Sequence, residues 1–162
     1  MHIYDVSTSR TKRLQVKVNW SRELTFSSRQ INFILETVPE ERGVYCIYAK
    51  NYRWKYRQYK WSGLIYIGSG WLDDRLSRHL ARQENEVLAD YLDKYDLAYR
   101  FDRIEDDDED EDWPRNVEAE LLDLFKIKFG NLPLANRREE PLADLDWEVE
   151  IEEPDYFSIL EI

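Results

Sequence analysis

The order of apolar and polar positions along the chain predicts five short strands. Residues 14–20 (LQVKVNW) and 97–104 (LAYRFDRI) alternate apolar and polar side chains with the period of a strand. Residues 43–50 (GVYCIYAK) and 63–68 (GLIYIG) are rich in β-branched and aromatic residues, which is typical of strands, and residues 147–153 (WEVEIEE) end the series. We expect the third and fourth of these segments to form an antiparallel hairpin with a long tip.

A helical period predicts four helices, over residues 27–38, 71–82, 85–94 and 114–129. Their expected inward-facing residues are Ile31, Ile34, Leu35 and Val38 in the first helix, Leu72, Leu76 and Leu80 in the second, and Leu121, Leu122, Phe125 and Phe129 in the last. Pro114 suits the first turn of the last helix, and the carboxylates before it favour the positive end of the helix dipole. Together these elements indicate an α+β fold.

Charge is distributed unevenly along the 162 residues, whose formal net charge is −11. Residues 1–104 hold 18 Lys or Arg against 13 Asp or Glu, whereas residues 105–162 hold 5 against 21. Neither part is basic enough to coat nucleic acid by bulk charge, so an anionic ligand requires a local patch. Residues 50–61 (KNYRWKYRQYKW) form such a patch in the sequence, with five basic side chains, five aromatic side chains and no carboxylate.

The sequence indicates a soluble, unexported protein. No window approaches the roughly 18 continuous apolar residues of a membrane span, and the first 14 residues lack the apolar core of a signal peptide. The single cysteine, Cys46, cannot form an internal disulfide, and its apolar run predicts a buried, reduced thiol. We therefore expect a cytoplasmic protein without a membrane partner.

Arg75 and His79 are the first candidates for chemistry. They are four residues apart in the second predicted helix, so they share one face, and the helix follows directly after a strand. An Arg and a His in this position can hold a phosphate. Taken alone, however, the pair fits a solvated helix face better than a site.

Around this pair the sequence resembles the GIY-YIG nuclease superfamily. Residues 43–45 (GVY) match the first signature tripeptide of that family, and residues 66–68 (YIG) match the second. Further matches follow in the family order: Arg75, His79 as a histidine that some members carry, Glu118 in VEAELLDLF and Asn136 in LPLAN.

The resemblance covers residues 42–138 and implies a small three-stranded antiparallel sheet flanked by helices. Residues 1–41 would form an N-terminal extension packed on this core, and residues 139–162 an acidic C-terminal extension. The resemblance also implies a Mg²⁺-dependent or Mn²⁺-dependent endonuclease that hydrolyses nucleic acid, DNA rather than RNA. Each active site would cut one strand, so cutting both strands in one event would require a homodimer.

The chemistry of phosphodiester hydrolysis accounts for these residue types. Arg75 can donate a planar fork to two phosphate oxygens, and Glu118 can hold a Mg²⁺ ion that keeps most of its waters. Tyr45 and Tyr66 would lie on adjacent antiparallel strands, so that their hydroxyl groups converge. The family's proposed mechanisms give the first tyrosine the role of orienting or deprotonating the attacking water, and His79 is the second candidate for the base.

Several of these residues also have a structural interpretation. Glu120 competes with Glu118 as the metal ligand, but Glu118 shares a helical face with the apolar residues and is preferred. Asn136 either braces the site by hydrogen bonds or simply forms a turn. Buried tyrosines in strands are common core residues, so Tyr45 and Tyr66 alone would not indicate a site.

The basic and aromatic segment lengthens the connection between the two tripeptides beyond what is usual in the family. We expect its cations to follow a nucleic-acid backbone and its rings to stack on bases, although the rings could instead form a local apolar patch. The nucleic-acid-binding candidates are Arg53, Trp54, Lys55, Arg57, Lys60 and Arg78. The acidic run 105–112 (EDDDEDED) is a solvated loop, a mimic of nucleic acid or a surface that repels it. A non-catalytic binding module with the same fold is the alternative to a nuclease.

Overall fold

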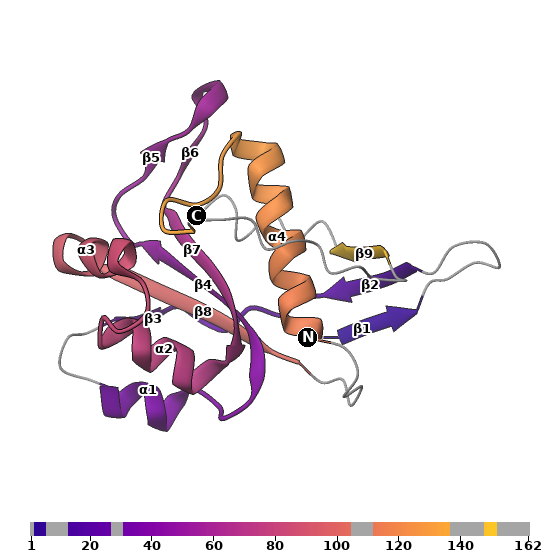
Figure 1. Ribbon diagram of the computed structural model, residues 1–162, viewed down its shortest axis with the longest axis horizontal. Coiled ribbons are helices and arrows are strands. Elements are labelled where there is room, and N and C mark those ends of the chain that lie inside the picture. The colour runs from indigo at the N-terminus through magenta and orange to yellow at the C-terminus, as the bar shows by residue number, and fades with distance from the viewer. Residues whose placement is uncertain (1, 6–12, 27–30, 105–111, 137–147, 152–162) are drawn as a thin grey trace.

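A four-stranded antiparallel sheet forms the centre of this computed structural model, which describes residues 2–5, 13–26, 31–104, 112–136 and 148–151 (Figure 1). In sheet order its strands are β3 (Leu24–Thr25), β8 (Leu97–Arg103), β4 (Arg42–Ala49) and β7 (Leu64–Trp71). The expectation of three strands is therefore wrong. The added strand, β3, has only two residues, too few to show an alternating pattern, and it is recruited through backbone hydrogen bonds to β8.

Helices cover both faces of this sheet. On one face lie α1 (Ile31–Thr37), α2 (Leu72–Leu80) and α3 (Glu86–Lys94), and on the other lies α4 (Trp113–Phe129) (Figure 1). The central strand β4 is buried on both sides because Tyr45 and Ile47 face α2, whereas Val44, Cys46 and Tyr48 face α4. This burial explains why its sequence reads as a continuous apolar run.

The predicted helices agree with the structure in place where it describes them, since residues 27–30 and the side chain of Ile31 lie outside the described part. The predicted inward-facing residues that can be checked are buried, with one exception. Leu72, Leu76 and Leu80 of α2 are buried, as are all four predicted residues of α4. The exception is Leu35 of α1, which was expected to face inward but is 51% exposed. Ile34 in this short helix and Val38 just after it, four residues apart, are buried in the core, and Leu35 lies to one side of that stripe.

A second sheet of three strands stands apart from the first. It has the order β1 (His2–Asp5), β2 (Arg13–Lys17) and β9 (Glu148–Ile151), with β2 parallel to β9. The predicted strand at 14–20 thus belongs to this sheet rather than to the central one, and the predicted final strand is confirmed over four residues. Parallel pairing joins segments from opposite ends of the chain, which local periodicity cannot reveal.

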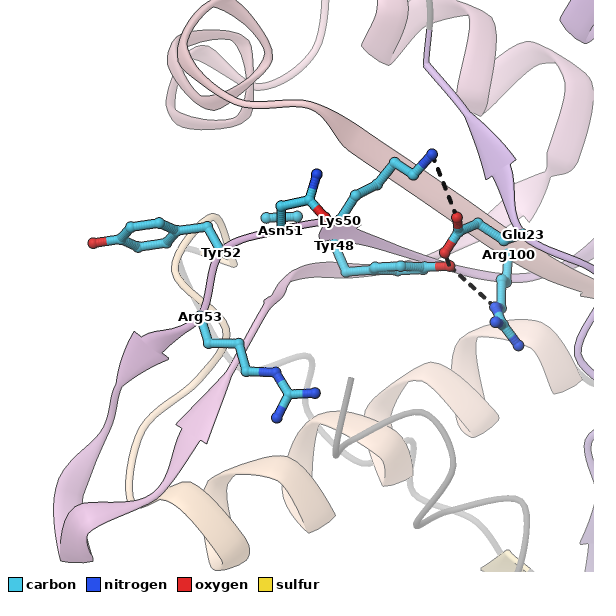
Figure 2. A pocket seen from close by; sticks show the side chains of 8 residues that line it. Glu23, Tyr48, Lys50, Asn51, Tyr52, Arg53 and Arg100 are labelled. Atoms are coloured by element: carbon cyan, nitrogen blue, oxygen red, sulfur yellow. Dashed lines mark hydrogen bonds and ion pairs between the residues drawn. The ribbon is translucent and has the colours of Figure 1, made fainter.

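The segment between β4 and β7 forms the expected long hairpin. The chain leaves β4 through Lys50, Asn51, Tyr52 and Arg53 (Figure 2) and then forms β5 (Trp54–Lys55), a 3₁₀ turn (Arg57–Tyr59) and β6 (Trp61–Ser62). One aromatic residue anchors each side of this hairpin. Tyr56 packs against Phe125 and Phe129 of α4, and Trp54 packs against Tyr91 and Tyr95 at the end of α3.

Two further expectations concern Cys46 and the start of α4. Cys46 is fully buried. At the N-terminus of α4 the side chain of Asp112 accepts a hydrogen bond from the backbone N–H of Arg115, while residues 105–111 of the acidic run lie outside the described part. Within the described residues, no helix is long and apolar enough to cross a membrane.

Candidate active site

Tyr45 and Tyr66 lie side by side on the α2 face of the sheet. Tyr45 is opposite Gly68 in the β4–β7 ladder and Tyr66 is opposite Ile47, so the two tyrosines form a diagonal pair with ring centroids 6.0 Å apart. Gly68 leaves the room that this pair needs, because a Cβ atom there would overlap the Tyr45 ring and lie 2.7 Å from Cε1 of Tyr66. The glycine of the second tripeptide is therefore required for packing rather than for a turn.

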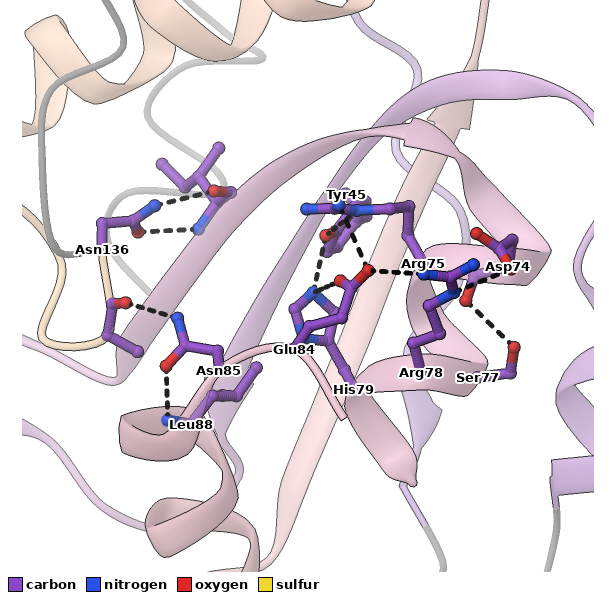
Figure 3. A network of polar contacts seen from close by, with 12 residues as sticks. Tyr45, Asp74, Arg75, Ser77, Arg78, His79, Glu84, Asn85, Leu88 and Asn136 are labelled. Carbon is purple, nitrogen blue, oxygen red and sulfur yellow. Dashed lines mark hydrogen bonds and ion pairs between the residues drawn. The ribbon is translucent and has the colours of Figure 1, made fainter. Parts of the chain in front are cut away.

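Helix α2 brings Arg75 and His79 against Tyr45 (Figure 3). The Tyr45 hydroxyl oxygen lies 2.7 Å from Nε2 of His79, and Nε of Arg75 donates to that oxygen at 3.5 Å. Arg75 can only donate to this oxygen, whereas the Tyr45 hydroxyl group either donates to Nε2 or accepts from it, according to the tautomer of His79. Nδ1 of His79 is buried and has no hydrogen-bond partner among the described residues.

Burial controls the protonation of this cluster. His79 is 2% exposed, and desolvation, followed by the Arg75 cation, lowers its pKa to about 3. Desolvation also raises the pKa of Tyr45 well above its usual value, and the neighbouring Tyr66 raises it further, while Arg75 lowers it. At neutral pH the cluster therefore holds a neutral imidazole, a protonated phenol and one guanidinium cation. A solvated helix face, the simpler interpretation of Arg75 and His79, is wrong for His79.

Glu84 completes the cluster, and sequence reasoning missed it. It lies in the loop between α2 and α3, with its Oε1 atom 3.3 Å from Nη1 of Arg75 and 3.7 Å from Nη1 of Arg78. Its other oxygen lies 3.7 Å from Nε2 of His79 (Figure 3). A glutamate in a polar loop gives no periodic signal, so only the fold reveals that this carboxylate meets the phosphate-binding candidates.

Glu118 approaches the cluster from α4, on the other side of the edge strand β7. Its carboxylate, 8% exposed, accepts a hydrogen bond from the hydroxyl group of Ser69 on β7. Its negative charge contributes to the raised pKa values of both Tyr45 and Tyr66, after burial in each case. The charge of the carboxylate therefore disfavours deprotonation of both tyrosines.

Glu118 is the residue for which the sequence predicts a metal-binding role. Within the part of the chain that the structure describes, no group of three or more His, Cys, Asp or Glu side chains could enclose a metal ion. Mg²⁺ keeps several of its waters and is commonly held by one or two carboxylates together with substrate phosphates. A single buried carboxylate at a strand edge suits this mode of binding and not a closed structural metal site.

Asn136 braces the strand that carries the second tripeptide. Its side-chain oxygen accepts from the backbone N–H of Ile67 at 3.0 Å, and its side-chain nitrogen donates to the carbonyl of the same residue at 2.9 Å (Figure 3). The outer edge of β7 is thus paired by a side chain instead of by another strand. Unlike Tyr45, Arg75 and His79, which contact one another through their side chains, Asn136 uses its side-chain amide to hydrogen-bond to the backbone of β7.

The basic residues of the hairpin divide between two surfaces. Lys55 and Arg57 line an open groove of about 550 Å³ that reaches Asn136, and the Arg57 side chain packs against Gly130 at the end of α4. Arg53 lines a different cavity, at the end of β4. Arg78, on α2, is exposed and also pairs with Asp74.

The aromatic residues of the hairpin are divided as well. Trp54 is half-buried in its cluster with Tyr91 and Tyr95, which favours a packing role, and Lys60 is partly buried. Tyr59 and Trp61 are 82% and 54% exposed, and Lys55 lies over the Tyr59 ring at 4.6 Å. These two exposed rings are better stacking candidates than Trp54, and sequence composition could not separate them.

The site thus combines an arginine, two tyrosines, a neutral histidine and two carboxylates at the edge of an antiparallel sheet. Comparisons of the chain with protein-family models, with curated proteins and with solved structures find no match.

Proposed function

We propose that the protein is a metal-dependent endonuclease that hydrolyses phosphodiester bonds at this site, by chemistry of the GIY-YIG type. One observation carries the proposal: Arg75 and His79 meet the hydroxyl group of Tyr45 beside Tyr66, at a strand edge that Glu118 approaches from the other side. These residues come from four different elements between positions 45 and 118, and a purely structural role does not require this set. A carboxylate, a guanidinium and a proton acceptor are what phosphodiester hydrolysis requires.

Arg75 is the residue that would bind the scissile phosphate. Its Nη1 atom is held by Glu84 in this structure, so an incoming phosphate would replace one negative partner by another. The planar guanidinium can donate to two phosphate oxygens and stabilise the charge that builds up on them in the transition state. In the absence of substrate, the Glu84 carboxylate would thus occupy the position beside Arg75 that the phosphate takes when it binds.

Tyr45 and His79 would position and deprotonate the attacking water. In the tautomer of His79 that is protonated at Nδ1, the Tyr45 hydroxyl group can accept the water's proton as its own proton moves to Nε2, 2.7 Å away. With a pKa of about 3, His79 is a weak base in this structure. The negative charge of a bound phosphate would raise that pKa and so make the transfer more favourable.

Glu118 would hold the metal ion, which supplies Lewis-acid stabilisation of the phosphate and of the leaving oxygen. The hydrogen bond from Ser69 fixes the orientation of the carboxylate. Tyr66 lies on the same strand and would donate to the phosphate from the other side. The groove that joins Lys55 and Arg57 to Asn136 offers a path for the substrate strand beside the site. The preference for DNA over RNA rests on the resemblance of the sequence motifs alone.

Nicking of supercoiled plasmid tests this function. We expect Mg²⁺ or Mn²⁺ to support conversion to the nicked form, EDTA to abolish it, and Glu118→Ala to lower the rate by at least about 100-fold. Glu120→Ala is the matched control, because it removes a carboxylate from the same helix two residues away, and it should keep most of the activity. Equal loss in both variants would assign the effect to helix α4 and not to a metal ligand.

A binding module without catalysis remains the second candidate, and the contact between Glu84 and Arg75 favours it. In such a protein Arg75 would be permanently neutralised and would serve only to hold the α2–α3 loop. Wild-type protein that binds nucleic acid but cuts neither duplex, single-stranded nor branched substrates with any divalent metal would establish this alternative.

A further inference from the structure

The hairpin formed by β5 and β6 has one buried face and one exposed face. In its ladder Trp54 is opposite Ser62, and Lys55 is opposite Trp61. Trp54 is half-buried and Ser62 is buried, whereas Lys55 and Trp61 are both exposed. The tip of the hairpin projects beyond the central sheet, beside the C-terminal end of α4 (Figure 1). Because residues directly opposite each other in a ladder lie on the same side of it, Lys55 and Trp61 share the exposed face.

Tyr59 adds a second ring to this exposed face. The side chain is 82% exposed, and Nζ of Lys55 lies over its ring, 4.6 Å from the centroid. Since Lys55 is also directly opposite Trp61, this one cation is a neighbour of both rings. We call Lys55, Tyr59 and Trp61 the outer face of the hairpin. It combines two exposed rings with one cation.

The backbone of Tyr59 has a conformation that the fold does not explain. Its φ of 58° lies in the left-handed region, which residues other than Gly, Asn and Asp rarely adopt. Arg82, the other described non-glycine residue with positive φ, is held there by hydrogen bonds to Asp93 and to the carbonyl of Leu80. The exposed Tyr59 ring gains no comparable burial or hydrogen bonding. An unfavourable backbone conformation that carries an exposed ring indicates a binding role.

The charge around the outer face favours nucleic acid as the partner. Residues 50–61 hold five basic side chains and no carboxylate. Lys55 also lines the groove that reaches Asn136, and the described lining of this groove includes Arg57 and no carboxylate. Asn136 in turn binds the backbone of β7 between Tyr66 and Gly68. Exposed rings among cations are typical of surfaces that bind single strands, and the groove connects this surface to the proposed active site.

Stacking on these rings requires a base with an accessible face. In a continuous duplex each base is covered on both sides by its neighbours, whereas unpaired bases can turn outward and stack on aromatic side chains. Phosphate contacts alone favour duplex, because its charge density is higher than that of a single strand. A preference for unpaired bases would therefore come from the rings and not from the cations.

We propose that the outer face of the hairpin binds unpaired bases of a nucleic-acid strand by stacking on Tyr59 and Trp61, so that the protein prefers single-stranded or partly unpaired substrates to continuous duplex. The unpaired bases belong to a single strand or to the unpaired part of a duplex, and the chemistry of recognition is the same. A preference in cleavage rests on the proposed nuclease function, whereas the binding does not.

Fluorescence anisotropy in EDTA tests the binding. The probes are a labelled oligothymidine of about 15 nucleotides, an abasic strand with the same number of phosphates, and a duplex of the same length. We expect oligothymidine to bind at least about tenfold more tightly than the abasic strand and about fivefold more tightly than the duplex. The abasic strand measures the contribution of phosphate contacts alone.

Two variants remove the rings, and a third keeps one of them. Tyr59→Asn and Trp61→Ala should each weaken oligothymidine binding about tenfold and leave binding of the abasic strand unchanged. Tyr59→Phe retains the ring and should keep the wild-type affinity. Because Asn tolerates the left-handed conformation, Tyr59→Asn should leave the unfolding midpoint unchanged or raise it by about 2 °C. Loss of affinity without loss of stability separates a binding role from a structural one.

Trp71→Ala is the matched control. Trp71 is 55% exposed, against 54% for Trp61, and it lies at the end of β7 that is remote from the hairpin. Equal weakening in Trp71→Ala and Trp61→Ala, or equal binding of oligothymidine and the abasic strand to the wild type, would overturn the proposal. So would a dimer that Trp61→Ala dissociates without any loss of oligothymidine affinity, since the rings would then form an interface between two copies of the chain.

A duplex with a single-stranded tail distinguishes the two sources of unpaired bases. Binding as tight as that of oligothymidine would identify the single strand, and binding that is at least about tenfold tighter would identify the junction. Because no cleavage is measured in EDTA, failure of this proposal is separate from failure of the nuclease proposal. A protein that nicks plasmid but binds oligothymidine no better than the abasic strand retains its proposed activity and lacks this site.

Discussion

His79 shows at the residue scale how burial selects one protonation state. The imidazole is 2% exposed, beside the Arg75 cation, and its pKa falls from the usual 6.5 to about 3. Its neutral Nε2 can then accept from Tyr45. A histidine in this state contributes to the pH dependence of stability as well as to the site.

Acid should therefore destabilise the fold through His79. Between pH 6.5 and about 3 the unfolded chain binds a proton at this residue that the folded chain does not, so stability falls as the pH falls through that window. From pH 6.5 to pH 4 the loss is of the order of 3 kcal/mol. We expect His79→Gln to show a shallower decrease, measured by urea unfolding at several pH values. Parallel curves for the two proteins would contradict the buried neutral state.

Glu84 is expected to compete with nucleic acid for Arg75. In Glu84→Gln the carboxylate is lost and the shape is kept, so an oligonucleotide should bind in EDTA about two- to tenfold more tightly at low salt. Fluorescence anisotropy measures this directly. The control is Asp74→Asn, which removes a carboxylate paired with Arg78 but leaves the contact between Glu84 and Arg75 intact. If oligonucleotide affinity rises equally in Glu84→Gln and Asp74→Asn, Glu84 does not compete with nucleic acid for Arg75.

At the scale of elements, β7 is an edge strand whose outer backbone groups are paired over a short stretch by the loop that follows α4. Asn136 pairs with both backbone groups of Ile67, and the backbone N–H of Ala135 donates to the carbonyl of Ile65. The loop after α4 thus acts in place of a fifth strand. An edge that is covered in this way keeps the tyrosine-bearing strand in register.

Asn136→Ala should loosen this edge. Two backbone groups of the buried Ile67 lose their partners, which costs about 1 to 3 kcal/mol of folding free energy. Thermal unfolding measures the loss, and amide hydrogen exchange should increase first in β7. Asn131→Ala, an exposed change in the same loop, serves as the control and should leave both readouts unchanged.

At the scale of the whole molecule, an acidic chain presents local cationic surfaces. The formal net charge of −11 would repel a polyanion, but Lys55 and Arg57 line a groove that leads to Asn136. Association with nucleic acid should accordingly be weak at high salt and depend on few contacts. The long hairpin is the element that places these contacts beside the proposed site.

Neutralising the groove should flatten the salt dependence of binding. Lys55→Gln combined with Arg57→Gln removes about two phosphate contacts, so the slope of log K against log salt should become less steep by about 2. The control combines Arg22→Gln with Arg103→Gln, two exposed cations that do not line the groove. An unchanged slope in the groove variant would exclude this surface from the interface.

Periodicity determined the local elements of this protein. The helices and the β4–β7 hairpin follow from apolar spacing and branched or aromatic runs, which act within a few residues. The sequence also pointed to Tyr45, Tyr66, Arg75 and His79 as one group, and the structure places them together.

Only the tertiary structure decided how distant segments meet. The two-residue strand β3, the parallel pairing of β2 with β9 and the exposure of Leu35 depend on long-range packing. The position of Glu84 over Arg75 likewise depends on how the α2–α3 loop folds back. Local propensity carries no information about which remote backbone or charge will be nearby, because that choice is made by burial and pairing across the whole chain.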